Sequence, residues 1–205
     1  MSQLYKLSKK DIKNAANVFA EAFCQYILYV PVIENQTKRK AFLHELYTML
    51  IKVSLKYGKV FATSSNFEGV VMYTEEQNAD TSFGKIIRAG GISNIFKMIW
   101  IAKFSGTKRF LQFSNAIDTI HKDFDKNNLY LQALAVTPEK QGQKFARTLI
   151  NTVLNDCKDQ NKGCYLETGD PKNVTIYEKY GFALLEDANS NANDKKIYYL
   201  HYKGL

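Results

Sequence analysis

A short polar loop between an apolar run and an amphipathic segment holds the residues best placed to do chemistry. The apolar run, 129–136, ends at a turn that contains Pro138. Beyond the turn, apolar residues recur at the spacing of one helix face, at Phe145, Leu149, Ile150, Val153, Leu154 and Cys157. The pattern predicts a strand, a loop and then a helix over 142–160. A helix start has unpaired backbone N–H groups and the positive end of the helix dipole, so it favours an anion, pyrophosphate especially.

A second cluster of polar and aromatic residues occupies 173–182. The pattern predicts a short helix over 173–180 that begins at an asparagine, a favoured N-cap residue. Tyr177 in this helix has two interpretations: a functional hydroxyl, or a core tyrosine that packs beside Ile176 and Tyr180. The cluster alone leaves both open.

The order of the predicted strands and helices around these clusters indicates an α/β fold in which the first half of the sheet is antiparallel. The nearly all-apolar run at 129–136 is typical of a central strand buried on both faces. At 205 residues we expect a single domain, 1–205, with a helical insertion at 80–126 before the fourth strand. The other predicted elements are a hairpin of strands at 59–63 and 69–73, strands at 4–7, 163–167, 182–185 and 197–202, and helices at 12–23, 42–57 and 83–124, the last interrupted at Gly90-Gly91 and Ser105-Gly106.

The net charge of +8 favours an anionic partner, either nucleic acid or a phosphorylated cofactor. The basic residues are spread along the chain without a block of like charges, which favours a solvated basic surface. Aromatic and basic residues at 83–113 could stack on RNA bases, but their helical spacing favours a core face. We therefore favour a small-molecule cofactor over nucleic acid.

Other classes of protein are disfavoured by what the sequence lacks. It has no run of about 18 uncharged apolar residues, so we expect no membrane span and no membrane partner. Cys24, Cys157 and Cys164 are odd in number and have no metal-ligand spacing, which predicts reduced thiols and a cytoplasmic location. The three histidines are scattered as well, and we predict no metal site.

Taken together and in this order, the two clusters resemble motifs of the GCN5-related N-acetyltransferase (GNAT) superfamily. The family's nucleotide motif, Gln/Arg-x-x-Gly-x-Gly/Ala, opens the helix after the central strand, and the segment 141–146 matches its first and last positions. The second motif, an Asn before Tyr-x-x-x-Gly-Phe, is matched by Asn173, Tyr177, Gly181 and Phe182. The element order also fits over nearly the whole chain, from residue 4 to residue 202.

The resemblance implies a mixed central sheet with splayed central strands and flanking helices. In relatives the region between the third and fourth strands often helps form the acceptor pocket, so the resemblance implies that the insertion at 80–126 could be a wall of that pocket. It also implies an N-acetyltransferase that moves an acetyl group from acetyl-CoA to a primary amine by direct transfer in a ternary complex. Tyr177 would be the general acid that protonates the leaving thiolate. The residues implied to hold the cofactor are Leu134, Ala135, Val136, Gln141, Gly142, Gln143, Lys144, Phe145, Ala146, Asn173 and Tyr177.

Lys144 stands where the family has the first glycine of its motif. A side chain there either crowds the pyrophosphate or pairs with it through its ammonium group, or it simply faces solvent. An acyl-CoA-binding protein of this fold that has lost catalysis is therefore an alternative, as is a basic nucleic-acid-binding module.

The general base and the acceptor are less specified. Glu167 follows the nucleotide-binding helix and lies near the point where the family's central strands separate, so it is our candidate for the base. Glu68 is a weaker candidate, and a water relay could replace either carboxylate. The acceptor amine stays open between small molecules and peptides, and a homodimer is possible because dimers are common among relatives.

Overall fold

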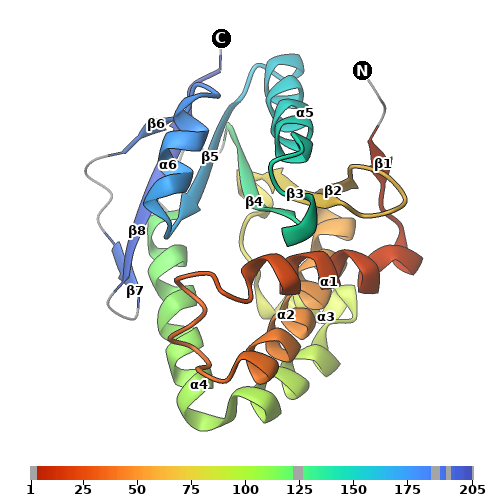
Figure 1. Cartoon of the computed structure of the whole chain (residues 1–205), viewed down its shortest axis with the longest axis vertical. Helices are drawn as coiled ribbons and strands as arrows, with labels where there is room; N and C mark the ends of the chain where they lie inside the picture. The colour runs from red at the N-terminus through yellow and green to blue at the C-terminus, as the bar shows by residue number, and fades with distance from the viewer. Residues whose placement is uncertain (1–3, 122–126, 186–189, 193–194, 205) are drawn as a thin grey trace.

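The computed structural model describes residues 4–121, 127–185, 190–192 and 195–204 (Figure 1). The strands are β1 (Tyr5–Lys6), β2 (Lys59–Ala62), β3 (Gly69–Glu75), β4 (Asn128–Val136), β5 (Gly163–Thr168), β6 (Ala183–Leu184), β7 (Ser190–Ala192) and β8 (Lys195–Tyr202). The helices are α1 (Ile12–Phe23), α2 (Gln36–Tyr57), α3 (Phe83–Ala89), α4 (Ile92–His121), α5 (Phe145–Asp159) and α6 (Pro171–Glu178), with 3-10 turns at Lys9–Asp11, Glu76–Asn78 and Pro138–Lys140.

The strands form one sheet in the order β1-β2-β3-β4-β5-β8-β6, and β7 pairs with β8. All neighbours are antiparallel except β4 and β5, which run parallel. The parallel pairing covers only Asn128–Tyr130 of β4 and Gly163–Tyr165 of β5, and the register ends there although both strands continue. The predicted mixed sheet, with an antiparallel first half and splayed central strands, is confirmed.

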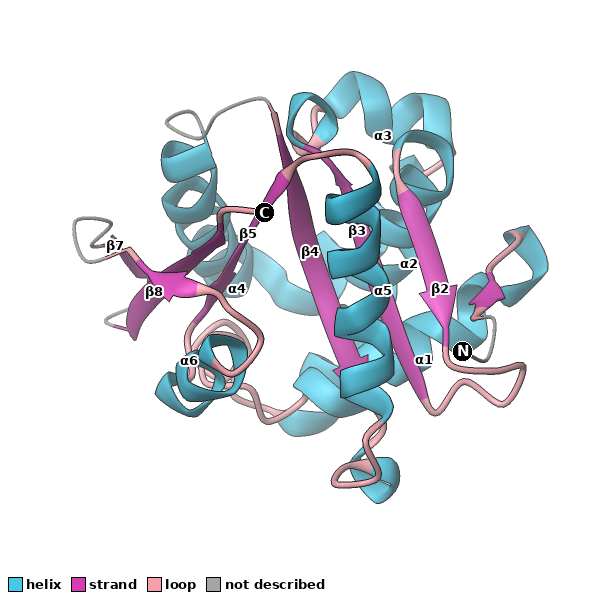
Figure 2. Cartoon of the chain, turned by 90° about the horizontal axis from the view of Figure 1, so that it is seen from above, coloured by secondary structure: helices cyan, strands magenta, loops and turns pink. Residues whose placement is uncertain are grey.

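Helices cover both faces of the sheet. Helices α1 and α2 lie on one face, and α5 and α6 lie on the other (Figure 2). The predicted apolar stripe of α5 is confirmed at Leu149, Ile150, Val153, Leu154 and Cys157, which are all buried, whereas Phe145 at its start is half-buried.

Several element boundaries differ from prediction. Helix α5 begins at Phe145 rather than near 142, because Gly142 and Lys144 both have a left-handed backbone, which no helix continues. Helix α2 begins earlier than expected, at Gln36, where the Asn35 side chain accepts a hydrogen bond of 3.0 Å from a first-turn N–H.

The predicted break at Gly90-Gly91 is confirmed, since it separates α3 from α4. The second break was predicted at Ser105-Gly106, but the non-helical backbone lies at Lys103 (φ 55°). The predicted helical stretch at 122–124 falls outside the described residues.

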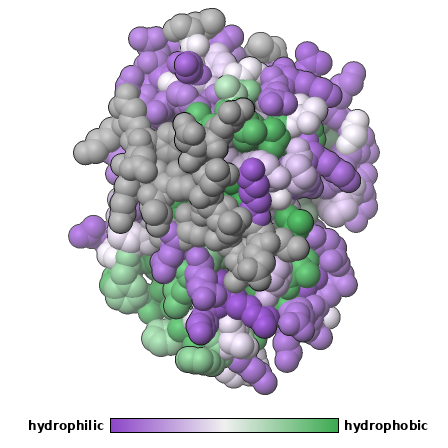
Figure 3. Space-filling view, turned by 90° about the vertical axis from the view of Figure 1, so that its left-hand side faces the viewer, coloured by the Kyte–Doolittle hydropathy of each residue, from purple (hydrophilic) through white to green (hydrophobic). Residues whose placement is uncertain are grey.

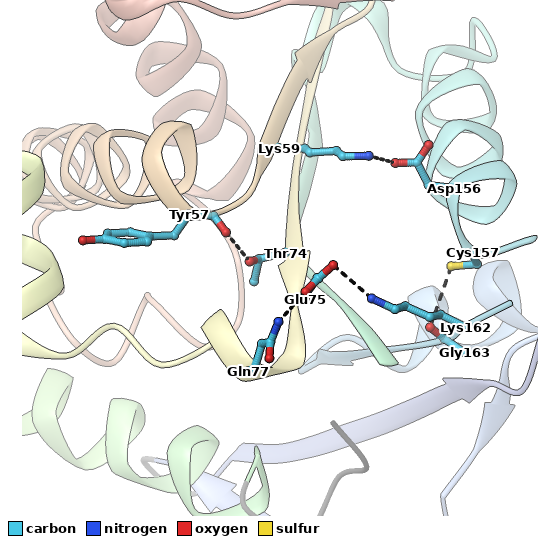
Figure 4. Close-up of polar contacts among 9 residues, drawn as sticks. All are labelled: Tyr57, Lys59, Thr74, Glu75, Gln77, Asp156, Cys157, Lys162 and Gly163. Carbon is cyan, nitrogen blue, oxygen red and sulfur yellow. Dashed lines mark hydrogen bonds and ion pairs between the residues drawn. The ribbon is translucent and has the colours of Figure 1, made fainter. Parts of the chain in front are cut away.

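Polar contacts connect neighbouring elements at the end of the sheet where β4 and β5 are paired (Figure 4). Lys162, just before β5, contacts Glu75 at the end of β3 with Nζ and Oε1 3.0 Å apart. On the α5 side, Lys59 of β2 contacts Asp156 at 2.5 Å. These contacts join strands and helix at one end of the β4–β5 pair, and we call this the closed end. Within the described residues, no helix is long and apolar enough to cross a membrane.

Candidate functional site

The site lies at the opposite end of the same strand pair, where β4 and β5 separate, and we call this the open end. Met72 of β3 pairs with Ala133 and Thr74 pairs with Tyr130, so β4 has one more residue than β3 between these two pairs. Such a bulge bends the strand and increases its twist. Beyond Tyr130, the edge of β4 that faces β5 has no strand partner within the described residues.

A cavity of about 450 Å³ lies at the open end. Its walls come from α1 and the segment after it, from α2, α4, β4 and β5, and from α6. Four residues named from the sequence line it together: Leu134, Glu167, Asn173 and Tyr177. The other predicted cofactor residues, Ala135, Val136 and 141–146, do not line it.

Glu167 is held by an aromatic pair. The Tyr130 hydroxyl donates a hydrogen bond to Glu167 Oε1. The Tyr130 ring stacks on the Tyr165 ring, with centroids 4.9 Å apart and planes inclined by 13°, because the two residues face each other in the last paired rung of β4 and β5. The carboxylate is therefore positioned by the strand register at the entrance to the open end.

A hydrogen-bond network surrounds the end of β5. The Thr168 hydroxyl lies 2.8 Å from the Tyr26 hydroxyl and accepts a hydrogen bond of 3.0 Å from the Asn173 amide. The Tyr26 hydroxyl accepts a hydrogen bond of 2.6 Å from the backbone N–H of Gly169. Glycine is needed there, because a Cβ on Gly169 would lie 2.4 Å from Leu28 Cγ. Burial raises the pKa of Tyr26, so its hydroxyl keeps its proton.

Asn173 does not cap the short helix. Helix α6 begins two residues earlier than predicted, at Pro171, and Asp170 is its N-cap, accepting a hydrogen bond of 2.9 Å from the N–H of Lys172. The cap interpretation of Asn173 was therefore wrong. Asp170 and Pro171, three and two residues before Asn173, were the available signals. Asp is a favoured N-cap residue, and Pro is favoured in the first turn of a helix.

Tyr177 projects from α6 into the cavity. Its ring meets Phe182 at 5.5 Å, edge to face. Burial raises the pKa of Tyr177 above its ordinary value, so the phenol stays protonated at neutral pH. Within the described part of the chain the hydroxyl makes no hydrogen bond, so it is available as a donor to a bound molecule.

The loop before α5 is shaped by its own side chains. Gln141 donates to the carbonyl of Val136 at 3.3 Å, and Gln143 donates to the carbonyl of Glu139 at 3.2 Å. Lys144 is the N-cap residue of α5 with φ 68°, and its side chain is exposed. This left-handed backbone favours glycine and strains any other residue by about 1–2 kcal/mol. No described side chain caps the first turn of α5, so its N–H groups have no side-chain partner among the described residues.

Glu68, the weaker candidate for a base, lies elsewhere. It does not line the cavity, and its carboxylate accepts hydrogen bonds from Thr63 (2.7 Å) and Ser64 (2.8 Å) in the β2–β3 turn. Burial acts to raise the pKa of the Glu68 carboxyl, but these hydrogen bonds outweigh burial and leave the pKa below its ordinary value. The geometry gives Glu68 a role in the turn.

Sequence reasoning missed a set of tyrosines that line the cavity, namely Tyr26, Tyr29, Tyr47 and Tyr130. The hydroxyls of Tyr29 and Tyr47 lie 3.0 Å apart and are buried. The only signal in the sequence was a cluster of aromatic residues at the end of the first predicted helix.

Comparison with known proteins agrees with this arrangement. Residues 116–203 match a family model described as an acetyltransferase (GNAT) domain. Over 206 residues the chain is 23% identical to an uncharacterized N-acetyltransferase of Schizosaccharomyces pombe, covering 94% of this chain and 78% of that protein.

Two solved structures are similar in fold. One is described as histone acetyltransferase HPA2 and related acetyltransferase from Corynebacterium glutamicum (TM-score 0.66, 16% identity, 99% of this chain and 96% of that chain). The other is the PaiA N-acetyltransferase of Thermoplasma acidophilum in complex with coenzyme A (TM-score 0.56, 16% identity, 99% of each chain). Residues 116–203 are therefore a GNAT acetyltransferase domain, and the chain as a whole is similar to an N-acetyltransferase in sequence and to solved acetyltransferases in fold.

Proposed function

We propose that the protein transfers an acetyl group from acetyl-CoA to a primary amine, directly and within a ternary complex. The observation that carries the proposal is the cavity at the open end, where Glu167 and Tyr177 lie beside the unpartnered edge of β4. A carboxylate and a protonated phenol in one cavity supply the proton acceptor and the proton donor that this reaction needs.

The cofactor fits two features of the chain. The edge of β4 beyond Tyr130 offers backbone groups that a pantetheine amide can pair with, at Leu134, Ala135 and Val136. The uncapped first turn of α5 offers N–H groups to the pyrophosphate. The similar fold of a protein solved with coenzyme A supports the same donor.

The chemistry begins with removal of a proton, because an alkylammonium ion with a pKa of about 10 is not a nucleophile. In our proposal Glu167 accepts that proton, directly or through water. The amine nitrogen then attacks the thioester carbon, and a backbone N–H near Leu134 to Val136 stabilises the oxyanion. When the C–S bond breaks, Tyr177 donates its proton to the CoA thiolate, and the extra proton on the new amide nitrogen passes to the Tyr177 phenolate.

A covalent acetyl-enzyme is disfavoured by the position of the cysteines. Cys24, Cys157 and Cys164 are all buried, and none of them lines the cavity. Burial also raises the pKa of the Cys164 thiol, which opposes thiolate formation. Direct attack by the amine is the simpler route.

Two measurements test the proposal. Titration calorimetry with acetyl-CoA should show saturable binding in the absence of nucleic acid, and thiol release should then depend on an added amine. Binding without release across a broad amine panel would point to an acyl-CoA sensor. No binding of acetyl-CoA would contradict the proposal altogether.

A further inference from the structure

The cavity walls define the class of acceptor, an inference that rests on the proposed acetyl transfer. We propose that the acceptor is a hydrophobic amine with a single positive charge, of the arylalkyl or medium-chain alkyl type.

The charge of the cavity walls favours an acceptor with one positive charge. Among the described residues that line the cavity, Glu167 is the only Asp, Glu, Lys or Arg. A polyamine or an aminoglycoside carries further ammonium groups, and each would be buried here without a carboxylate to pair with. Burial of an unpaired charge is strongly unfavourable. One acidic side chain therefore matches one ammonium group.

The composition of the walls favours this acceptor as well. Beyond Glu167 the lining is mostly aliphatic and aromatic, and its aromatic members include Phe42, Tyr47, Phe110 and Phe113. Apolar groups gain by leaving water for such a lining, and aromatic rings also gain from edge-to-face contacts. The Phe110 and Phe42 rings already meet in this way at 5.2 Å.

Helix α4 supplies the mouth of the cavity. Ile99 and Leu111 line the cavity although they are 48% and 54% exposed, so they border both cavity and solvent. Because Leu111 lies at the rim, a charge placed there changes what the cavity accepts without filling its core.

The test compares 2-phenylethylamine with spermidine in the thiol-release assay. We expect kcat/KM to favour 2-phenylethylamine by about 100-fold. Leu111→Glu should reduce that preference by about tenfold, because it adds a second carboxylate at the rim. Gln112→Glu is the matched control, since Gln112 is exposed, adjacent and outside the cavity lining. It should leave the preference unchanged.

The outcomes separate the two proposals. Turnover that favours spermidine would overturn the acceptor class and leave acetyl transfer intact. If no amine is acetylated, the proposed function fails. Calorimetry of the two amines with the protein then decides the inference, which is overturned unless 2-phenylethylamine binds more tightly.

A different observation carries a second inference, about the outer face of α3 and α4. Hydrophobic side chains gather at the lower end of the molecule, where α4 lies (Figures 1 and 3). On these helices Phe96, Trp100 and Phe104 are 68%, 83% and 87% exposed, and Phe83 and Ile87 are exposed as well. Phe96 and Trp100 are four residues apart, as are Phe83 and Ile87, so each pair lies on one helix face.

The same face is basic. Residues 81–117 contain Lys85, Arg88, Lys97, Lys103, Lys108 and Arg109 but no Asp or Glu, and three of these residues are paired with carboxylates outside the segment, Lys85 with Asp80, Lys97 with Glu45 and Arg109 with Glu34. Arg88, Lys103 and Lys108 are exposed and form no ion pair with a described residue. Exposed aromatic side chains flanked by basic residues are typical of a surface that lies in the headgroup region of an anionic membrane.

The geometry points to peripheral docking of this face, which we call the α3–α4 face, on an anionic lipid bilayer. This proposal replaces the expectation of no membrane partner, which rested on the lack of a membrane span, because docking at the surface needs no membrane-spanning helix. A symmetric dimer through the same face would bring like charges together, which opposes self-association.

Trp100 is the only tryptophan of the chain, so its fluorescence reports on this face directly. Its emission should shift to the blue when vesicles of phosphatidylcholine and phosphatidylserine are added, and the shift should weaken as salt is raised. Phe96→Ser combined with Phe104→Ser should weaken vesicle binding about tenfold while thiol release is retained. Ile176→Ser, at an exposed position on α6, is the control and should bind vesicles normally.

An unchanged emission with anionic vesicles would overturn the inference. Vesicle binding that survives the double substitution would overturn it too. So would a dimer, seen by light scattering, that the double substitution dissociates, because the face would then be an interface between two copies of this chain.

Discussion

The closed and open ends of the β4–β5 pair contain the same chemical unit in two different settings. At the closed end, Tyr165 donates a hydrogen bond to Glu76, which follows β3. At the open end, Tyr130 donates to Glu167, and the two tyrosine rings stack on each other.

The settings differ in one respect: Glu167 lines the cavity, and Glu76 does not. Glu76 is buried, and burial raises its pKa to about 7. We propose that only a tyrosine-bound carboxylate with access to the cavity takes part in catalysis. Substitutions at the two ends should therefore have separable effects.

The largest effect is expected from Glu167→Gln. An amide cannot accept the proton of the incoming ammonium ion, so kcat should fall by about 10³-fold, within the range for loss of a general base. Glu76→Gln is the matched control at the closed end and should leave kcat within a factor of about two. Steady-state thiol release with both variants makes the measurement. A Glu167→Gln enzyme with normal kcat would move the base to water or to another group.

Tyr177→Phe should lower kcat by about 10²-fold, because it removes the proton donor to the thiolate and leaves the ring in place. Since burial raises the pKa of Tyr177 above the ordinary value of 10.0, the wild-type rate should show no loss of this acid up to about pH 10. Tyr180→Phe, close by in the chain but outside the cavity lining, is the control. Equal kcat for wild type and Tyr177→Phe would remove Tyr177 from the mechanism.

Lys144→Gly should separate stability from cofactor binding. Glycine relieves the left-handed strain, so Tm should rise by about 2–4 °C, the shift that about 1 kcal/mol produces in a domain of this size. Loss of the exposed ammonium should weaken acetyl-CoA binding about threefold. Lys140→Gly, in the 3-10 turn without positive φ, should lower Tm instead. Unchanged acetyl-CoA binding in Lys144→Gly would leave the lysine no part in holding the cofactor.

The smallest effect is expected at the closed end, and it depends on pH. The pKa of Glu76 is raised from 4.5 to about 7, so the folded state binds more protons than the unfolded state between these values. The contribution of Glu76 to the stability of the fold is therefore fully present below about pH 4.5 and is lost as the pH rises toward 7. Glu76→Gln should remove this loss and unfold about 2 °C higher than wild type at pH 8, with a smaller gain at pH 5. A gain that is the same at both pH values would contradict the assignment.

Local patterns in the sequence predicted the parts of the site that depend on local structure. The stripe from Leu149 to Cys157 fixed the buried face of α5, and the loop before it lies at the end of β4 as expected. The left-handed backbone of Lys144 was not predictable from residue type, because lysine rarely adopts it.

Contacts between distant parts of the chain escaped prediction. Tyr130 and Glu167 are 37 residues apart, and Tyr26 and Thr168 are 142 apart. Both contacts depend on sheet register and on how α1 packs over the open end, which periodicity does not reveal. The sequence identified the Glu167 carboxylate as a candidate base. Its hydrogen bond with Tyr130 could be found only in the structure.

The central claim is direct transfer at the open end, and quenched-flow analysis with acetyl-CoA tests it most directly. The protein is mixed with acetyl-CoA alone or with acetyl-CoA and 2-phenylethylamine, and the quenched samples are assayed for free CoA, for the N-acetylated amine and for acetyl groups on the protein. Our account predicts CoA release only when the amine is present, one N-acetylated amine for each CoA, and unmodified protein throughout. A burst of CoA without amine, together with acetylated protein, would contradict it.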